Sequence, residues 1–199
     1  MSKVIKISIL CACILVFFIL LAACHRSKPP DIIIETAATS EVETTKSQPQ
    51  VVEAQTQEYL ENYVKNNYSE ELVILAKIVF GESRGIKSQT EQACIIWTVL
   101  NRYDNGYWGD SIKKVALAPY QFGYVETNPM IDDYGRSLYD LAVDVMVRWY
   151  REKTYNISIG RVLPSDYFYY WGDGAHNYFT KEYRSNVVWD YQYFSPYEA

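Results

Sequence analysis

Hydrophobic residues recur with helical spacing between residues 69 and 85. Four of them stand at i, i+3, i+4 and i+7 and therefore share one helix face: Leu72, Leu75, Ala76 and Val79. Ser69 is a favourable N-cap residue, and Gly85 is typical of the position just beyond a helix C-terminus. The pattern predicts an amphipathic helix that packs its apolar face against the rest of the domain.

A second helix is predicted directly after the first. The stretch SQTE, residues 88–91, has the form of a capping box, with Ser88 at the N-cap and Glu91 three positions later. The following QACIIWTVLNR is apolar on nearly all sides, which is typical of a central, buried helix. Cys94 lies within it and is interpreted as a small core residue, not a nucleophile. Residues 104–106 then end the helix in a turn.

Two more helices and an aromatic segment complete the predicted domain. We expect a short helix over residues 111–117, a loop over residues 119–135 and a long helix over residues 137–153. The glycine-bearing stretch DYFYYWGDGAHNYF, residues 166–179, predicts a short hairpin or ordered loops. The expected fold class is therefore mainly α, with a small irregular or hairpin C-terminal part.

The first 24 residues have the layout of an export signal. Lys3 and Lys6 precede a strongly apolar segment, residues 7–23, which ends in LAAC with Cys24 as its last residue. These last four residues resemble a bacterial lipobox, in which the cysteine becomes the lipidated first residue of the mature protein. An uncleaved membrane anchor is the alternative, because the apolar segment is close to the length of a spanning helix. Both interpretations place the remainder of the chain outside the cytoplasm, tethered to the bacterial membrane.

A flexible linker is predicted between this segment and the folded domain. Residues 25–57 are rich in Ser, Thr, Gln, Glu and Pro, whereas all 19 Tyr and all 5 Trp lie from Tyr59 onward. This change in composition places the domain at residues 58–199, which is long enough to bury a core. Cys94 is the one cysteine of the domain, so no disulfide is possible within it.

The charge and the histidine content restrict the chemistry expected of the domain. The net charge is −5, and no segment is basic enough to predict nucleic-acid binding. Only His25 and His176 are present; His25 belongs to the predicted linker, and His176 alone, with no cysteine nearby, does not make a zinc site. We therefore expect neither a metal ion nor another cofactor. His176 has no obvious partners for a catalytic triad, so acid–base chemistry is the remaining candidate.

Glu82 is the candidate acid, in the stretch GESRG at the end of the first predicted helix. It follows Leu75 by seven positions and Ile78 by four, so its side chain is in line with the apolar face. Partial burial and the negative end of a helix dipole both favour the protonated form of a carboxyl group, as a general acid requires. The alternative is that Glu82 turns outward where the helix frays, or pairs with Arg84 or Lys87. The spacing alone leaves both interpretations open.

These residues belong to a longer pattern that resembles bacterial cell-wall hydrolases of the spore-cortex lytic enzyme type. In that family one helix ends in Gly-Glu-Ala-Arg-Gly and the next in Val-Leu-Asn-Arg; here residues 81–85 read GESRG and residues 99–102 read VLNR. A Gln-Phe pair follows in the family, seen here as Gln121 and Phe122, and then an aromatic segment, matched by YFYYW at residues 167–171. The resemblance covers nearly the whole predicted domain.

The resemblance implies a lysozyme-like fold and cleavage of the glycan strands of peptidoglycan by lytic transglycosylation. It makes Glu82 the catalytic acid, with no second essential carboxylate. A hydrolytic muramidase is the first alternative; a second acid for it would come from Asp104, Asp166 or Asp173. A non-catalytic peptidoglycan-binding lipoprotein is the second alternative.

Substrate contacts are expected from residues in the matching motifs and the aromatic segment: Asn101, Gln121, Phe122 and Tyr169. The family tends to carry a His-x-Phe motif near its C-terminus, where residues 192–194 of this chain read QYF. No role of that histidine is therefore carried over. A spore-specific role and general wall remodelling both stay open.

Overall fold

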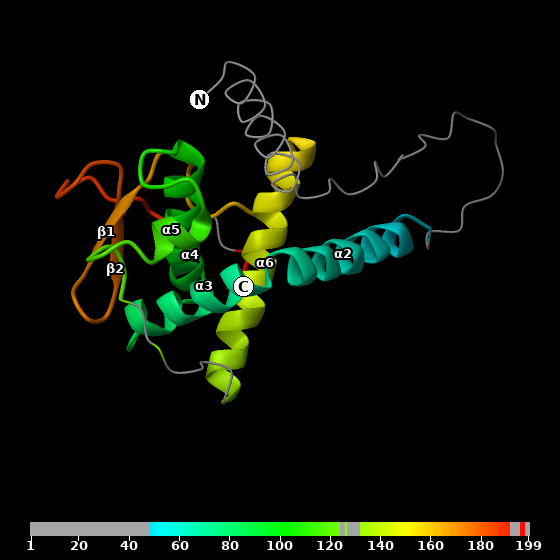
Figure 1. The fold of residues 1–199 in the computed structure, drawn as a ribbon, viewed down its shortest axis with the longest axis horizontal. Helices are drawn as coiled ribbons and strands as arrows, with labels where there is room; N and C mark the ends of the chain where they lie inside the picture. Colours follow the sequence, from blue (N-terminus) through cyan, green and yellow to red (C-terminus); the bar gives the residue numbers. More distant parts are fainter. Residues whose placement is uncertain (1–47, 124–125, 127–131, 192–195, 198–199) are drawn as a thin grey trace, which may run out of the picture. The chain divides into compact units, whose positions relative to one another are not determined.

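The computed structural model describes residues 48–123, 126, 132–191 and 196–197. The helices are α2 (Gln48–Asn67), α3 (Ser69–Glu82), α4 (Gln89–Asn105), α5 (Ile112–Ala116) and α6 (Asp133–Tyr155). Two short strands, β1 (Tyr169–Gly172) and β2 (Asn177–Thr180), form one antiparallel hairpin (Figure 1). The described part of the chain is therefore mainly α with a small hairpin, as the hydrophobic pattern predicts.

The N-terminal predictions meet the structure only in part. The export signal or anchor, residues 1–24 with Cys24, and residues 25–47 of the linker lie outside the described residues. No helix in the described part of the chain is long and apolar enough to cross a membrane. Residues 48–57 form the start of α2, so the linker prediction is corrected there. Gln, Glu and Ala are good helix formers, and composition alone did not separate a polar helix from a linker.

Helix α4 is the centre of the hydrophobic core. All of its residues from Thr90 to Arg102 are buried, and the helix packs against α3, α5 and α6. The Ser88 hydroxyl accepts a hydrogen bond from the Glu91 backbone N–H at 3.2 Å, which confirms the predicted N-cap. Gly106, in the left-handed region at φ 77°, ends the helix. The pattern that is apolar on nearly all sides thus corresponds to a helix covered on several sides (Figure 1).

Helix α3 turns its predicted apolar face toward this core. The four stripe residues are all buried: Leu72, Leu75, Ala76 and Val79. The predicted Ser69 cap is wrong, because the capping residue is Tyr68, whose side chain makes no capping hydrogen bond. Helix α2 ends only one residue earlier, and the Tyr68 backbone N–H donates to the Val64 carbonyl oxygen at 2.9 Å. This backbone hydrogen bond continues the pattern of α2 up to the residue that precedes α3.

Helix α6 begins at Asp133, four residues earlier than predicted. The Asp132 carboxylate accepts a hydrogen bond from the Gly135 N–H at 2.7 Å and so acts as the N-cap. The predicted loop over residues 119–135 therefore ends too late, because Asp132 caps α6 and Asp133 is its first residue. Helix α6 packs against α2, α3 and α4, and in Figure 1 it runs across the region where α2 and α3 meet.

The hairpin has one aromatic pair on each face. Its register places Tyr170 opposite Phe179 and Trp171 opposite Tyr178. Phe179 is fully buried, and its ring centroid lies 5.4 Å from that of Tyr170. Trp171 and Tyr178 stack on the other face with centroids 4.2 Å apart. One face of the hairpin thus packs on the core, and the other lies at the surface.

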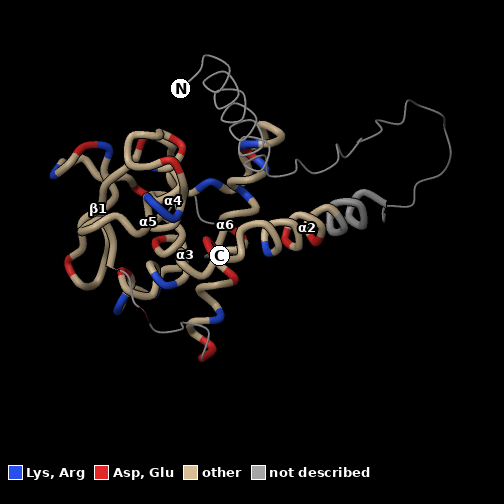
Figure 2. Tube along the Cα trace, viewed as in Figure 1, with Lys and Arg blue, Asp and Glu red and all other residues tan. Residues whose placement is uncertain are grey.

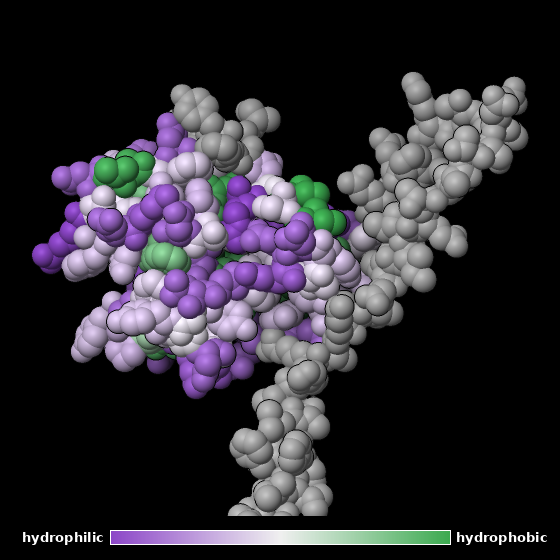
Figure 3. Space-filling view, turned by 90° about the horizontal axis from the view of Figure 1, so that it is seen from above, coloured by the Kyte–Doolittle hydropathy of each residue, from purple (hydrophilic) through white to green (hydrophobic). Residues whose placement is uncertain are grey.

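Exposed aromatic residues gather near the hairpin. Elsewhere, charged residues of both signs are interspersed along the described chain (Figure 2), and the face in Figure 3 carries only small, separate hydrophobic areas. Against this background Tyr120 is 104% exposed, Tyr183 69% and Trp171 47%. Large apolar rings that stay in water next to one another often mark a binding surface.

Candidate active site around Glu82

Glu82 is the last residue of α3 and lines a surface depression of about 350 Å³, here called the central depression. The lining comes from the end of α3, from α4, from the loop that follows α5 and from the hairpin; it includes Arg84, Arg102, Gln121, Tyr170, Trp171 and Asn177. Glu82 is the sole carboxylate in the described lining. Among the described residues, no ion pair joins it to Arg84 or Lys87. The carboxylate on the apolar stripe therefore opens onto a depression.

Gly81 allows a distant loop to reach this carboxylate. A Cβ at position 81 would lie 2.1 Å from the carbonyl oxygen of Gly123, so any side chain would push that loop away. With glycine in place, the Gly123 backbone N–H donates a hydrogen bond to Glu82 Oε1. A Cβ at Gly123 would lie 2.8 Å from the same oxygen. The two glycines together fix the orientation of the carboxyl group.

The Tyr170 hydroxyl is buried beside Glu82. Burial raises the pKa of Tyr170 well above its usual value, and the charge of Glu82 raises it further. The proximity of the Tyr170 hydroxyl group to Glu82 contributes to the raised pKa. Among the described residues, this hydroxyl group has no partner in standard hydrogen-bond geometry. Tyr170 therefore stays protonated at neutral pH and keeps its hydroxyl group as a donor next to Glu82.

Arg102 brings a buried positive charge to the same depression. Arg102 is only 5% exposed, and this burial lowers the pKa of its guanidinium group. Nε donates to the Phe168 carbonyl oxygen at 2.7 Å, and Nη1 donates to Gln121 Oε1 at 3.0 Å. Arg102 thus connects α4, the Gln121 loop and the segment that leads into β1. Arg102 is the last residue of the VLNR motif, but the sequence pattern did not predict that it lines the central depression.

Two wider depressions adjoin the central one. The hairpin depression, about 810 Å³, shares Arg102 and Trp171 with the central depression and extends to Tyr183. The α6 depression, about 880 Å³, shares Arg84 with the central depression and extends to Tyr134 at the start of α6. Because the central depression shares lining residues with each of the other two, the three are here called the groove, and Glu82 lies in the central one. A groove that continues on both sides of the acid suits an extended ligand.

Two of the four predicted substrate contacts line this groove. Gln121 lines both the central and the hairpin depressions. Tyr169 lines the hairpin depression, where its ring centroid lies 6.2 Å from that of Trp108 and 5.9 Å from that of Tyr183. The structure therefore brings Gln121 and Tyr169 together with Glu82 along one surface.

The other two predicted contacts, Phe122 and Asn101, do not line the three depressions. The Phe122 ring is partly buried against Arg102, whose guanidinium carbon lies 4.8 Å from its centroid. Asn101 is 1% exposed, and its amide nitrogen donates to the carbonyl oxygens of Pro164 and Tyr167 at 2.8 and 2.9 Å. The prediction of substrate contact is therefore corrected for Asn101, which instead ties α4 to the segment before β1.

The candidate second acids also lie outside the lining of the central depression. Asp104 accepts a hydrogen bond from Trp149 Nε1 at 3.1 Å and pairs with Lys153 at 2.9 Å. Asp166 pairs with Lys181 at 2.5 Å. Both carboxylates thus have other partners on other parts of the surface.

Asp173 shapes the hairpin turn. Its Oδ1 accepts hydrogen bonds from the backbone N–H groups of Ala175 and His176, both at 2.8 Å. Its Oδ2 accepts another from the Tyr178 hydroxyl at 2.8 Å. The two backbone hydrogen bonds, followed by that from Tyr178, lower the pKa of Asp173 to about 2. The carboxylate therefore holds the turn between β1 and β2, residues 173–176, and stays ionised at neutral pH.

Glu91 is a buried acid near the site. The sequence pattern identified Glu91 only as part of a capping box. It is fully buried, and its Oε1 accepts a hydrogen bond from the Asn177 backbone N–H. Its Oε2 accepts one from the Tyr191 hydroxyl at 2.5 Å and lies 3.2 Å from His176 Nδ1. The Asn177 side chain in turn donates to the Glu82 carbonyl oxygen at 3.4 Å. Glu91 thus holds the strand that contacts the end of α3.

The remaining candidate groups give no further chemistry. Cys94 is fully buried, as predicted, and burial raises the pKa of its thiol, so no thiolate forms at neutral pH. Across the part of the chain that the structure describes, no three His, Cys, Asp or Glu side chains cluster in a way that could hold a metal ion.

Comparison of the chain with protein-family models, with curated proteins and with solved structures found no match. The groove and its residues are therefore the basis for a functional assignment.

Proposed function

We propose that this protein is a peptidoglycan lytic transglycosylase with a lysozyme-like catalytic domain and Glu82 as its one catalytic acid. The observation that carries the proposal is the central depression, in which Glu82 is the sole carboxylate of the described lining. The family-like motifs around Glu82 support it further. From the N-terminal segment we further propose that the enzyme is tethered to the membrane outside the cytoplasm, through a lipid on Cys24 or through an uncleaved helix.

The reaction needs one group that first gives and then takes a proton. Protonated Glu82 donates its proton to the glycosidic oxygen between N-acetylmuramic acid and N-acetylglucosamine, and the bond from that oxygen to C1 of the muramic residue breaks. The resulting Glu82 carboxylate takes the proton of the muramic 6-hydroxyl group. The oxygen of that hydroxyl group bonds to C1 of the same residue and closes the anhydro ring. Proton and electron pairs balance without water or a second acid.

Neighbouring groups support these roles. The Gly123 N–H holds Oε1 of Glu82 and so limits rotation of the carboxyl group. The buried Tyr170 hydroxyl remains a donor through the reaction because its pKa is raised. Trp171, 47% exposed and lining the central depression, offers a ring face against which a sugar ring can pack.

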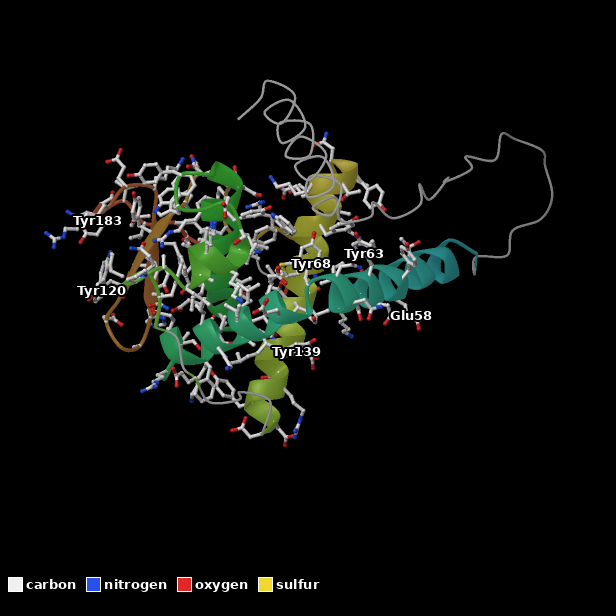
Figure 4. All side chains as sticks on the ribbon, viewed as in Figure 1. Glu58, Tyr63, Tyr68, Tyr120, Tyr139 and Tyr183 are labelled. Atoms are coloured by element: carbon white, nitrogen blue, oxygen red, sulfur yellow. The ribbon has the colours of Figure 1, made fainter. Side chains whose placement is uncertain are left out.

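Digestion of purified peptidoglycan tests the proposal. Wild type should release muropeptides with anhydro ends, and Glu82→Gln should lower the rate by about 100- to 10,000-fold, the range typical of a general acid. Glu58→Gln is the matched control, since it removes a carboxylate from the exposed side of α2 (Figure 4). Undiminished cleavage by Glu82→Gln would refute the assignment. Products with reducing ends would indicate a hydrolytic muramidase, and binding without any release would indicate a wall-binding lipoprotein.

A further inference from the structure

The groove around Glu82 is positively charged within a chain of net charge −5. Its three depressions are lined by four basic residues, and the described acidic ones are Glu82 and Asp132. Asp132 already serves as the N-cap of α6. The basic residues are Arg84, Lys87, Arg102 and Arg184. A concave surface with this excess of positive charge attracts anions.

The groove arginines have no described carboxylate partner, and neither does Arg151, whereas several other arginines outside the groove have one. Arg148 and Arg161 lie outside the groove, and each pairs with a carboxylate at 2.7 Å. By contrast, among the described residues no Asp or Glu forms an ion pair with Arg84, Arg102 or Arg184. A guanidinium group without a carboxylate partner, in a groove, is available to a charged ligand.

The buried charge of Arg102 costs free energy unless an anion binds next to it. Arg102 is 5% exposed, and its described hydrogen-bond acceptors are neutral oxygens of Phe168 and Gln121. Aromatic rings surround it, with the Trp108 and Tyr169 centroids each 5.7 Å from the guanidinium carbon. Neutral acceptors and ring faces offset only part of the cost of burying a charge. A carboxylate in the hairpin depression would supply the missing counter-ion.

Arg184 approaches the same depression from a strained segment. Its φ is 59°, in the left-handed region that non-glycine residues seldom adopt, and its guanidinium carbon lies 5.1 Å from the Tyr183 ring centroid. Tyr120 also lines this depression and has φ 62°. Figure 4 places Tyr120 and Tyr183 on the hairpin side of the domain. Residues in this backbone region often cluster at ligand sites, because binding geometry compensates for the strain.

We propose that the hairpin depression binds carboxylates of the peptides that substitute the glycan strand, through Arg102 and Arg184. This inference rests on the proposed function, and it defines the substrate as peptide-bearing, anionic peptidoglycan. The sugar rings of the strand offer hydroxyl and acetamido groups, which are neutral. The peptides attached to the muramic lactyl group carry the carboxylates. A muramic residue without its peptide would carry only the carboxylate of its lactyl group and would lack those of the peptide.

Binding of a soluble muropeptide tests the inference separately from catalysis. The full-length Glu82→Gln protein is titrated with a disaccharide tetrapeptide, and then with the same muropeptide after its carboxyl groups are converted to methylamides. We expect methylamidation to weaken binding about tenfold or more, as loss of a charge-assisted hydrogen bond does. Arg184→Asn, added to this protein, should remove most of that difference, since Asn tolerates the left-handed backbone.

Lys65→Gln is the matched control, because it removes a positive charge from a surface pair on α2 and should leave both affinities unchanged. Arg184→Lys should retain part of the preference for the charged muropeptide, which a purely structural role of Arg184 does not predict. Equal binding of the two muropeptides, binding of neither, or an unchanged preference in Arg184→Asn would overturn the inference. Cleavage of peptidoglycan by wild type without any charge preference would refute this inference alone. Charge-dependent binding without cleavage would refute the enzymatic proposal and leave the binding site standing.

Discussion

The buried carboxylate of Glu91 gives a prediction about stability that does not depend on the proposed activity. Glu91 lies in the first turn of α4, and its side chain joins three separate parts of the chain. It accepts hydrogen bonds from the Asn177 backbone and the Tyr191 hydroxyl, and it contacts His176. Glu91→Ala removes all three contacts and leaves a space where the carboxylate stood.

The loss in the free energy of unfolding can be worked out from the hydrogen bonds that each partner of Glu91 loses. The Asn177 N–H is buried, and a buried donor that loses its acceptor costs about 1–3 kcal/mol. The hydrogen bond from Tyr191 to a charged group contributes about 1.5–3 kcal/mol. The His176 side chain is 58% exposed, so water replaces its contact at little cost. Release of a desolvated charge offsets part of the sum, and we expect Glu91→Ala to lower the free energy of unfolding by about 3 kcal/mol.

Urea unfolding followed by circular dichroism measures this loss. Glu91→Gln keeps the shape and one carbonyl oxygen for the Asn177 N–H, so it should lose only about 1–2 kcal/mol. Glu70→Ala is the control, because it removes a carboxylate from an exposed pair with Lys113 and should cost at most about 1 kcal/mol. If Glu91→Ala were as stable as Glu70→Ala, the buried contacts would contribute nothing and the reasoning would fail.

Two further variants test the geometry near Glu82. Gly81→Ala should lower the rate of peptidoglycan cleavage about 100-fold, the usual effect of misplacing a reacting group by about 1 Å, because its Cβ displaces Gly123. Gly106→Ala strains the backbone at φ 77° but meets no atom within 4 Å, so it should lower stability and leave the rate of cleavage by the folded protein unchanged; equal rates in both variants would contradict the role of Gly81. Asp173→Ala should destabilise the protein at neutral pH. Because the folded-state pKa of Asp173 is lowered from 3.8 to about 2, the stability difference from wild type should shrink as pH falls from about 4 to about 2. A difference independent of pH over this range would show that the charge of Asp173 is not involved.

Local patterns predicted the helices because a helix is a local structure. Leu72, Leu75 and Val79 are buried as their spacing predicts, and Ser88 caps α4 as its capping box predicts. The whole of α2 and the start of α6 were missed. Both are polar segments in which helix formers or an Asp cap give a weaker signal than hydrophobic periodicity does.

The polar residues of the candidate site were harder to assign. Asn101 and Arg102 are neighbours in the same motif, yet the first is used wholly inside the protein and the second lines the groove. Both lie on a helix that is buried nearly all round, so periodicity could not separate them. Glu91 fits a capping box, but its carboxylate binds residues from the hairpin and beyond.

The sequence by itself determined that Glu82 follows an apolar stripe and stands at the end of its helix, since both properties depend on neighbours within one or two turns. Only the tertiary structure decided what surrounds the carboxylate. Gly123 and Tyr170 lie 41 and 88 positions further along the chain, and they reach Glu82 because Gly81 has no side chain and the hairpin packs against the core. Contacts between such distant segments depend on how whole elements pack, and no local spacing encodes them.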